Sequence, residues 1–348
     1  MKKNKKVIFN GVFLVAVFAL TIYGVFHGED LESMMDAIRS ADKRWLAPGL
    51  ALVAFFIWGE SIIRWYMMRS YGIKVKKKTC FLFSSVGFFF SCITPSASGG
   101  QPMQAYYMKK KNIPIPVSAV ILMIITITYK LVLVVIGIGV AVFGRGFLHQ
   151  YLEGILPVFY LGLALNIFCV TFMTILVFHP LLARNFMVWG LKILEKLHIL
   201  RRKDGRLKKL EDSMDAYRDT AAYLKTHSKV IANVIGITFV QRMAMFAVTW
   251  FVYRSFSLSG TGFWTVLFLQ AVISVSVDML PLPGGMGISE TLFLTIFTPV
   301  FGTLLLPGMV LSRGLGYYGE LLISALFTIV AQFTIGHEHD SKEKESYE

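Results

Sequence analysis

Long apolar segments recur along the whole chain, and they constrain the fold more than any other feature. The hydrocarbon core of a bilayer is about 30 Å thick, so a helix that crosses it needs about 20 predominantly apolar residues. Composition agrees, because 55% of the 348 residues are hydrophobic and only 16% are charged, against about a quarter in an average soluble domain. The sequence therefore predicts an all-α polytopic membrane protein and excludes soluble, disordered and disulfide-rich secreted classes. We expect about six full spans, at residues 7–26, 45–68, 114–143, 152–178, 229–253 and 307–335.

Two further apolar segments are interrupted by proline and paired glycine. Residues 80–108 contain TPSASGGQP at 94–102, and residues 263–301 contain LPLPGGMGIS at 280–289. Proline and glycine end helices, and irregular backbone at membrane depth persists only where protein or a water-filled cavity satisfies it. We therefore expect two re-entrant helical hairpins, each entering and leaving on one side of the membrane. The residues expected to break them and to permit gating are Pro95, Gly99, Gly100, Pro281, Pro283, Gly284, Gly285 and Gly287.

The distribution of lysine and arginine predicts the orientation. With six spans and two hairpins, most of the 35 Lys and Arg residues fall on the same side as both termini. Short cytoplasmic loops are rich in these residues, so we expect the termini and a basic loop at about 180–228 to be cytoplasmic. Contact of these loops with anionic lipid headgroups explains the formal net charge of +14, and no nucleic acid partner is expected.

The chain is expected to form one integral membrane domain over residues 1–336. Within the basic loop, residues 186–200 alternate apolar and basic side chains. This pattern predicts a helix lying in the membrane interface, and a solvated connector is the alternative. Residues 337–348 are charged and are expected to form a disordered tail.

Charged residues inside the predicted membrane segments are the candidate site. Each would cost about 3 kcal/mol at the bilayer centre if unpaired. Glu60 and Arg64 lie one helical turn apart, and Arg313 and Glu320 two turns apart, so ion pairs that only tie helices together are one interpretation. The other is contact with a lipid headgroup, for which Lys130 and Arg242 near mid-span are the most informative. The candidate substrate-binding residues are Arg64, Lys130, Arg242, Asp278, Glu290, Arg313 and Glu320.

The order of these features repeats along the chain. Arg64, the first break and Lys130 are matched by Arg242, the second break and Arg313. The two halves would run in opposite directions through the membrane, which is typical of an inverted-repeat transporter with its site at the broken helices. Coincidence between common residue types is the alternative.

The sequence lacks the patterns of an enzyme. The seven histidines lie in loops, at span ends or in the tail, so Ser96 and Ser98 have no evident base, although a deprotonated Lys130 would supply one. No nucleotide, hydrolase or metalloprotease motif occurs, and the three cysteines do not have metal-ligand spacing. We expect no metal, no cofactor and no catalytic residue.

Several of these residues also resemble a known family. Pro95 with Gly99-Gly100, the pair Arg64-Trp65, and LPLPGGMGISE at 280–290 followed by Arg313 are similar to the lysylphosphatidylglycerol synthase transmembrane (flippase-domain) family. The resemblance covers about residues 7–335, and the fairly specific part is Pro-x-Pro-Gly-Gly-x-Gly-x-x-Glu.

The resemblance implies membrane helices with re-entrant elements and movement of a lipid between leaflets. In the best-understood relatives this domain accompanies an aminoacyl-transferase domain, which we expect this chain to lack, since about a dozen residues follow Ile335. We therefore expect a flippase for a phospholipid, an aminoacyl-phospholipid or a glycolipid in a prokaryotic cytoplasmic membrane. Membrane lipids are its expected partners, together with a separate lipid synthase or transferase. The alternatives are a non-transporting partner of a separate envelope-lipid enzyme and a lipid-modifying enzyme.

Overall fold

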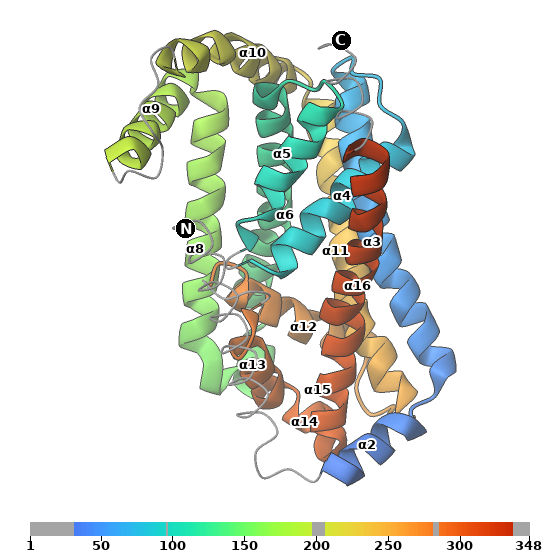
Figure 1. The fold of residues 1–348 in the computed structure, drawn as a ribbon. Coiled ribbons are helices and arrows are strands. Elements are labelled where there is room, and N and C mark those ends of the chain that lie inside the picture. Colours follow the sequence, from blue (N-terminus) through green and yellow to red (C-terminus); the bar gives the residue numbers. More distant parts are fainter. Residues whose placement is uncertain (1–30, 95–96, 197–205, 281–284, 337–348) are drawn as a thin grey trace.

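The computed structural model describes residues 31–94, 97–196, 206–280 and 285–336, and these are helical with short connections (Figure 1). Five helical segments among the described residues are long and apolar enough to cross a membrane. They confirm five of the predicted spans, and the sixth, at residues 7–26, lies outside the described residues. The spanning segments are α3 (Lys43–Ser70), α6 (Ile115–Phe143), α8 (Leu156–Phe178), α11 (Ser228–Ser255) and the run that contains α15 (Leu305–Arg313) and α16 (Gly319–Ala331).

The first hairpin enters from the upper end of the molecule in Figure 1 and returns to it. It consists of α4 (Lys77–Cys92) and α5 (Gly100–Lys110), with the predicted break between them. The second hairpin enters from the lower end and consists of α12 (Phe263–Val277) and α13 (Ile288–Ile296), followed by α14 (Thr298–Phe301). Each hairpin therefore begins and ends on one side, as predicted, and the two come from opposite sides.

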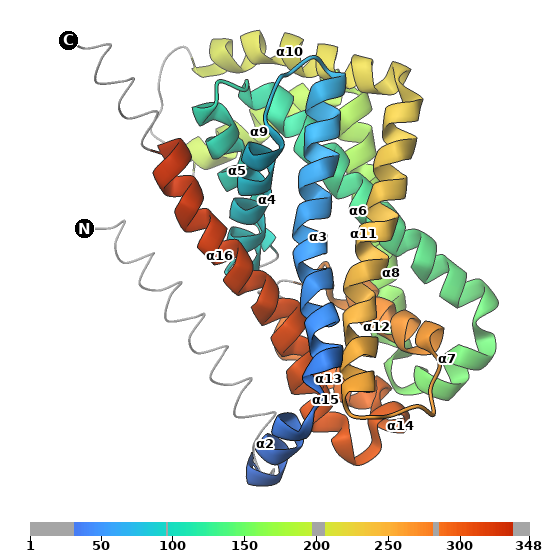
Figure 2. The ribbon, with the colours of Figure 1, turned by 90° about the vertical axis from the view of Figure 1, so that its right-hand side faces the viewer.

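The helices that precede the hairpins also run in opposite directions. α3 rises from the lower to the upper end before the first hairpin, and α11 descends before the second (Figures 1 and 2). These two helices pack against each other along the middle of the molecule, and α16 packs against α4. This arrangement is the one that an inverted repeat requires.

The basic segments that the structure describes gather at the upper end. The turns after α3 and α5 lie there, together with α9 (Pro180–Lys196) and α10 (Arg206–Thr226), which crosses that end (Figures 1 and 2). Tyr223 on α10 donates a hydrogen bond to the carbonyl of Ser70 at 2.6 Å. The chain forms a helix over the first part of the predicted interfacial segment, and Leu181 and Trp189 on α9 are exposed.

Two apolar cores hold the bundle together, one towards each end. The lower core includes Leu133, Phe159 and Phe293, and the upper core includes Met67, Ile121 and Val234. Two further short helices, α2 (Leu31–Ser40) and α7 (Arg145–Tyr151), lie in the lower half of the molecule (Figure 2).

Candidate functional site

A cavity of about 560 Å³ lies where the two hairpin tips approach each other. Ala97 and Gln101 line it from the first hairpin, and Asp278 and Gly285 line it from the second. Side chains of α3, α6, α8, α11 and the last spanning segment complete the wall. The volume is within the range of about 300–1,000 Å³ that is usual for small-molecule sites.

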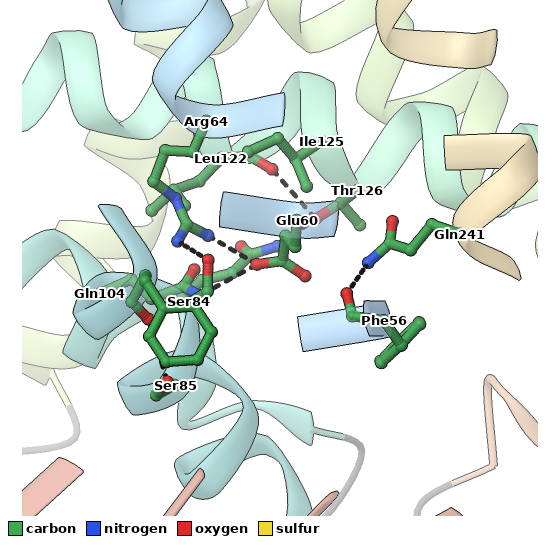
Figure 3. Close-up of polar contacts among 12 residues, drawn as sticks. Phe56, Glu60, Arg64, Ser84, Ser85, Gln104, Leu122, Ile125, Thr126 and Gln241 are labelled. Atoms are coloured by element: carbon green, nitrogen blue, oxygen red, sulfur yellow. Dashed lines mark hydrogen bonds and ion pairs between the residues drawn. The ribbon is translucent and has the colours of Figure 1, made fainter. Parts of the chain in front are cut away.

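On the α3 side of the cavity, Glu60 and Arg64 form the ion pair that their spacing predicts (Figure 3). Arg64 Nη2 lies 2.6 Å from Glu60 Oε1, and Arg64 Nη1 donates to Ser84 Oγ on α4 at 2.7 Å. Gln104 on α5 donates to the same carboxylate oxygen at 3.3 Å. Arg64 is fully buried and does not line the cavity, whereas Glu60 does. The pair therefore links the first hairpin to α3 and presents one carboxylate to the cavity.

A second ion pair joins α6 to the second break. Lys130 Nζ lies 2.5 Å from Asp278 Oδ2, and the hydroxyl of the adjacent Tyr129 donates to Asp278 Oδ1. Asp278 is the residue that follows α12, so its carboxylate fixes the end of that helix against the middle of α6. Both members of the pair line the cavity. Lys130 thus has the partner that its sequence neighbours do not provide.

A third ion pair lies where the second hairpin resumes its helix. Arg313 Nε lies 2.8 Å from Glu290 Oε1, and Glu290 Oε2 accepts a hydrogen bond from the backbone N–H of Gly287 at 2.7 Å. Glu290 is in the first turn of α13, where a carboxylate is stabilised by the free N–H groups and the helix dipole. The carboxylate of Glu290 both caps the helix and neutralises Arg313, and only Arg313 of the two lines the cavity.

Arg242 differs from the other three membrane cations because it forms no ion pair with any described residue. Its guanidinium carbon lies 3.5 Å from the centre of the Tyr129 ring and 4.7 Å from that of Phe56. Its Nε atom is buried and has no hydrogen-bond partner in the described part of the chain. Aromatic faces attract a cation, although they leave its N–H donors unsatisfied. Arg242 lines the cavity and has donor capacity available for a ligand.

Glu320 is the corresponding membrane anion without an ion-pair partner among the described residues. Its Oε1 accepts only a long hydrogen bond from the thiol of Cys92, at 3.8 Å. A π-helical segment, Gly314–Tyr318, separates it from Arg313, which shifts the two side chains from the relative position that a regular α-helix would give. The partner of Arg313 is therefore Glu290, and not the Glu320 suggested by the two-turn spacing. Glu320 is close enough to Arg242 and Glu60 to interact with them electrostatically.

Glycine is required at the two breaks for different structural reasons. Gly285 and Gly287 have φ angles of +66° and +84°, in the left-handed region that favours glycine. Gly100 begins α5 and does not have a positive φ angle. A Cβ on it would nevertheless lie 2.0 Å from Ser91 Oγ and 2.7 Å from the carbonyl oxygen of Gly87. A Cβ on Gly99 would lie 2.7 Å from Thr94. The first break therefore needs glycine for close packing and the second for backbone conformation.

The structure brings most of the predicted site residues to one cavity. Lys130, Arg242, Asp278, Arg313 and Glu320 line it, as does Gly285. Arg64 and Glu290 do not line the cavity, but each forms an ion pair with a residue that does. The predicted break residues Pro95, Pro281, Pro283 and Gly284 lie outside the described residues.

Several uncharged residues of the site were not predicted from the sequence. Tyr129 contacts both Arg242 and Asp278, and Gln104 binds Glu60. Ser312 lines the cavity, is buried, and its hydroxyl has no partner among the described residues. Gln270 also lines the cavity and accepts a hydrogen bond from Thr249. Glutamine inside an apolar segment is a sequence signal that would have found Gln104 and Gln270, because a polar side chain in a membrane needs a partner. Tyr129 and Ser312 carry no such signal.

The described part of the chain contains no group of three or more His, Cys, Asp or Glu side chains placed to hold a metal ion. Among the described residues, the site is instead built from paired charges, one cation and one carboxylate that form no ion pair there, and neutral polar side chains. Such a site suits a polar ligand that carries charge.

The sequence also matches a known protein family. A family model described as the lysylphosphatidylglycerol synthase TM region matches residues 8–324. Comparison with curated proteins gives no match. The matched region includes both hairpins and every candidate site residue. Because the match covers most of the chain, this protein belongs to the lysylphosphatidylglycerol synthase transmembrane family.

Proposed function

We propose that this protein is a lipid flippase that moves a polar-headgroup lipid between the leaflets of a prokaryotic cytoplasmic membrane. The substrate class is a phospholipid, an aminoacyl-phospholipid or a glycolipid. The termini and the basic upper end face the cytoplasm in this proposal, because lysine and arginine concentrate there. The protein acts as a transporter without catalysis, and a separate synthase or transferase supplies its lipid.

The observation that carries the proposal is the unpaired Arg242 in a cavity between two oppositely directed hairpins. An unsatisfied cation at membrane depth is costly unless a ligand, water or another charge compensates it. A headgroup phosphate or other anionic group accepts charge-assisted hydrogen bonds from a guanidinium. Arg242 would therefore bind the anionic part of the headgroup, with Tyr129 holding the guanidinium plane in position.

The other charged residues keep the cavity intact and supplement that contact. The pairs Lys130–Asp278 and Glu290–Arg313 attach the second hairpin to α6 and to the last spanning segment. Glu320 lines the cavity and forms no ion pair with a described residue, so it would interact with a cationic or hydroxyl group of the headgroup. Movement of the two hairpin tips about their breaks would expose the cavity alternately to the two leaflets.

The experiment is a leaflet assay with the purified protein in liposomes. Anionic, zwitterionic, cationic and glycosylated lipids with a fluorescent headgroup are tested separately, and a membrane-impermeant reductant bleaches the outer leaflet. If the protein is a flippase, the reductant bleaches more than half of the label on the time scale of lipid transport. We expect Arg242→Ala to slow transport by more than about tenfold, because a hydrogen bond to a charged group contributes about 1.5–3 kcal/mol.

The matched control is Arg254→Gln, on the same helix. Arg254 lies outside the cavity wall, stacks over Trp45 and donates to the carbonyl of Leu258 at 3.1 Å. This variant should transport like the wild type.

Normal transport by folded Arg242→Ala would contradict the role of Arg242. Absence of transport for every lipid by folded wild type would favour a non-transporting partner of an envelope-lipid enzyme. A chemically altered lipid, detected by mass spectrometry, would favour an enzyme.

A further inference from the structure

The tip of the first hairpin and α8 both contribute to the wall of the cavity. On the hairpin side, Ala97 and Gln101 line the cavity and are exposed. On the α8 side, Cys169 and Met173 line it and are half-buried. Thr126 of α6 also lines it and accepts a hydrogen bond from the Gln101 amide. These five residues are referred to as the rim.

The rim lies near the middle of the membrane. Gln101 is at the start of α5, whose 11 residues rise to the upper end, a length of about 16 Å at 1.5 Å per residue. That is about half of a 30 Å hydrocarbon core. Cys169 is in the central turns of α8, which runs from Leu156 to Phe178. Both sides of the rim are therefore at the depth of the lipid tails.

A polar side chain exposed at that depth requires an explanation. The Gln101 amide uses an N–H on Thr126, and its side-chain carbonyl forms no hydrogen bond with any described residue. Lipid tails offer no hydrogen bonds, so an exposed amide is unfavourable there unless water or a polar ligand reaches it. An opening that admits polar groups satisfies this requirement.

The outer face of α8 beside the rim is apolar. Ile167, Phe168 and Phe172 are 40%, 67% and 36% exposed, as expected for side chains that contact lipid tails. Cys169 faces the cavity between them and is close enough to Lys130 to interact with its charge. Cys169 and the Lys130–Asp278 pair therefore line the same cavity, beside an apolar outer surface.

We propose that the cavity opens to the bilayer at this rim, and that this opening is the portal through which a membrane lipid passes its headgroup into the cavity while its tails remain in the bilayer against α8. The proposal rests on the proposed function, because it specifies the route to the same site. Gln101 and Thr126 are the polar contacts of the headgroup at the rim.

The cysteines of the chain allow a direct test. Cys80 and Cys92 are buried, whereas Cys169 is at the rim. Protein in liposomes is treated with N-ethylmaleimide or with a maleimide that carries a bulky polar group, and each sample is compared with its own unmodified rate. We expect Cys169 to react in the folded protein, and the bulky adduct to reduce transport at least tenfold. The Cys169→Ser variant should lose this sensitivity.

The control places the same adduct on a different helix. Val240 on α11 is 56% exposed and does not line the cavity. Val240→Cys in the Cys169→Ser background carries the group away from the rim, where it should leave that variant's rate unchanged. Full transport by labelled wild type, equal inhibition through position 240, or reaction of Cys169 only after unfolding would each overturn the portal.

A second readout separates the portal from transport itself. A small bimane fluorophore on Cys169 should be quenched by lipids with a nitroxide on the headgroup, because a headgroup in the portal reaches the membrane centre. Quenching without any transport would reject the proposed function and retain the portal. Transport without quenching would reject the portal and retain the function.

Discussion

Lys130 Nζ lies 2.5 Å from Asp278 Oδ2, and this contact connects the middle of α6 to the break in the second hairpin. The two residues are 148 positions apart in the sequence. The pair is largely buried, so each charge depends on the other for compensation. The position of the second hairpin tip is therefore tied to a span from the first half of the chain.

Loss of one member of this pair should destabilise the protein more than loss of both. Lys130→Met or Asp278→Leu leaves one buried charge uncompensated, with an expected cost of about 3–5 kcal/mol. The double variant removes both charges and should recover most of that loss. Denaturant unfolding in detergent, followed by tryptophan fluorescence, measures the three changes. Losses that simply add in the double variant would show that the two charges are not coupled.

Close packing inside the first hairpin should make Gly87 intolerant of any side chain. A Cβ there would lie 1.6 Å from Gln104 Nε2, so the amide that binds Glu60 must move. Overpacking of this kind costs about 1–3 kcal/mol, and we expect Gly87→Ala to lower the stability by that amount and to reduce transport.

The matched substitution is Gly139→Ala on α6, where nothing lies within 4 Å of the added Cβ. Alanine in a helix interior is favoured over glycine by about 0.5–1 kcal/mol, so this variant should be as stable as the wild type or more so. Thermal melting in detergent compares the two. Equal behaviour of the two variants would mean that the hairpin is packed less tightly than the structure shows.

The second break should be sensitive to backbone conformation. Gly287 has a φ of +84°, and a left-handed conformation costs an L-residue about 1–2 kcal/mol. Gly287→Ala should therefore lower the stability by about that amount and weaken the contact of Glu290 with the backbone. Gly236→Ala, at an open position of α11, is the control. A fully stable Gly287→Ala protein would argue against this conformation.

Docking of α10 across the upper end should depend on one phenol. Tyr217 is buried and donates a hydrogen bond to the carbonyl of Leu176 at 3.0 Å. Burial raises its pKa to about 12, so the hydroxyl keeps its proton and donates at neutral pH. Tyr217→Phe should cost about 1 kcal/mol, seen as faster proteolysis of the segment around α10. Tyr66→Phe, which removes only a half-exposed acceptor of Asn233, should leave proteolysis unchanged.

The sequence predicted the spanning segments and both hairpins because their causes are local. Apolar length determines which segments can cross a bilayer, and proline with paired glycine interrupts a helix wherever it occurs. The pair Glu60–Arg64 was predictable for the same reason, since residues four apart share one face of a helix. The basic residues at 109–111 favoured a first hairpin that returns to the end from which it enters, because a single span would have separated them from the other basic segments.

The ion pairs across the cavity were decided by tertiary structure. Spacing along the chain pointed from Arg313 to Glu320, but the π-helical segment between them changes their relative orientation, and the second hairpin presents Glu290 instead. Asp278 and Glu290 were both available to Lys130 in the sequence, and only packing of α12 against α6 selects Asp278.

Arg242 shows most clearly what each level determines. The sequence by itself determined that a cation lies in the middle of a span, where it needs compensation. Only the tertiary structure decided that it receives two aromatic faces and no carboxylate within ion-pair distance among the described residues. The physical reason is that hydrophobic length and helix breaking act within one segment, whereas charge compensation depends on which side chains of distant segments meet in three dimensions.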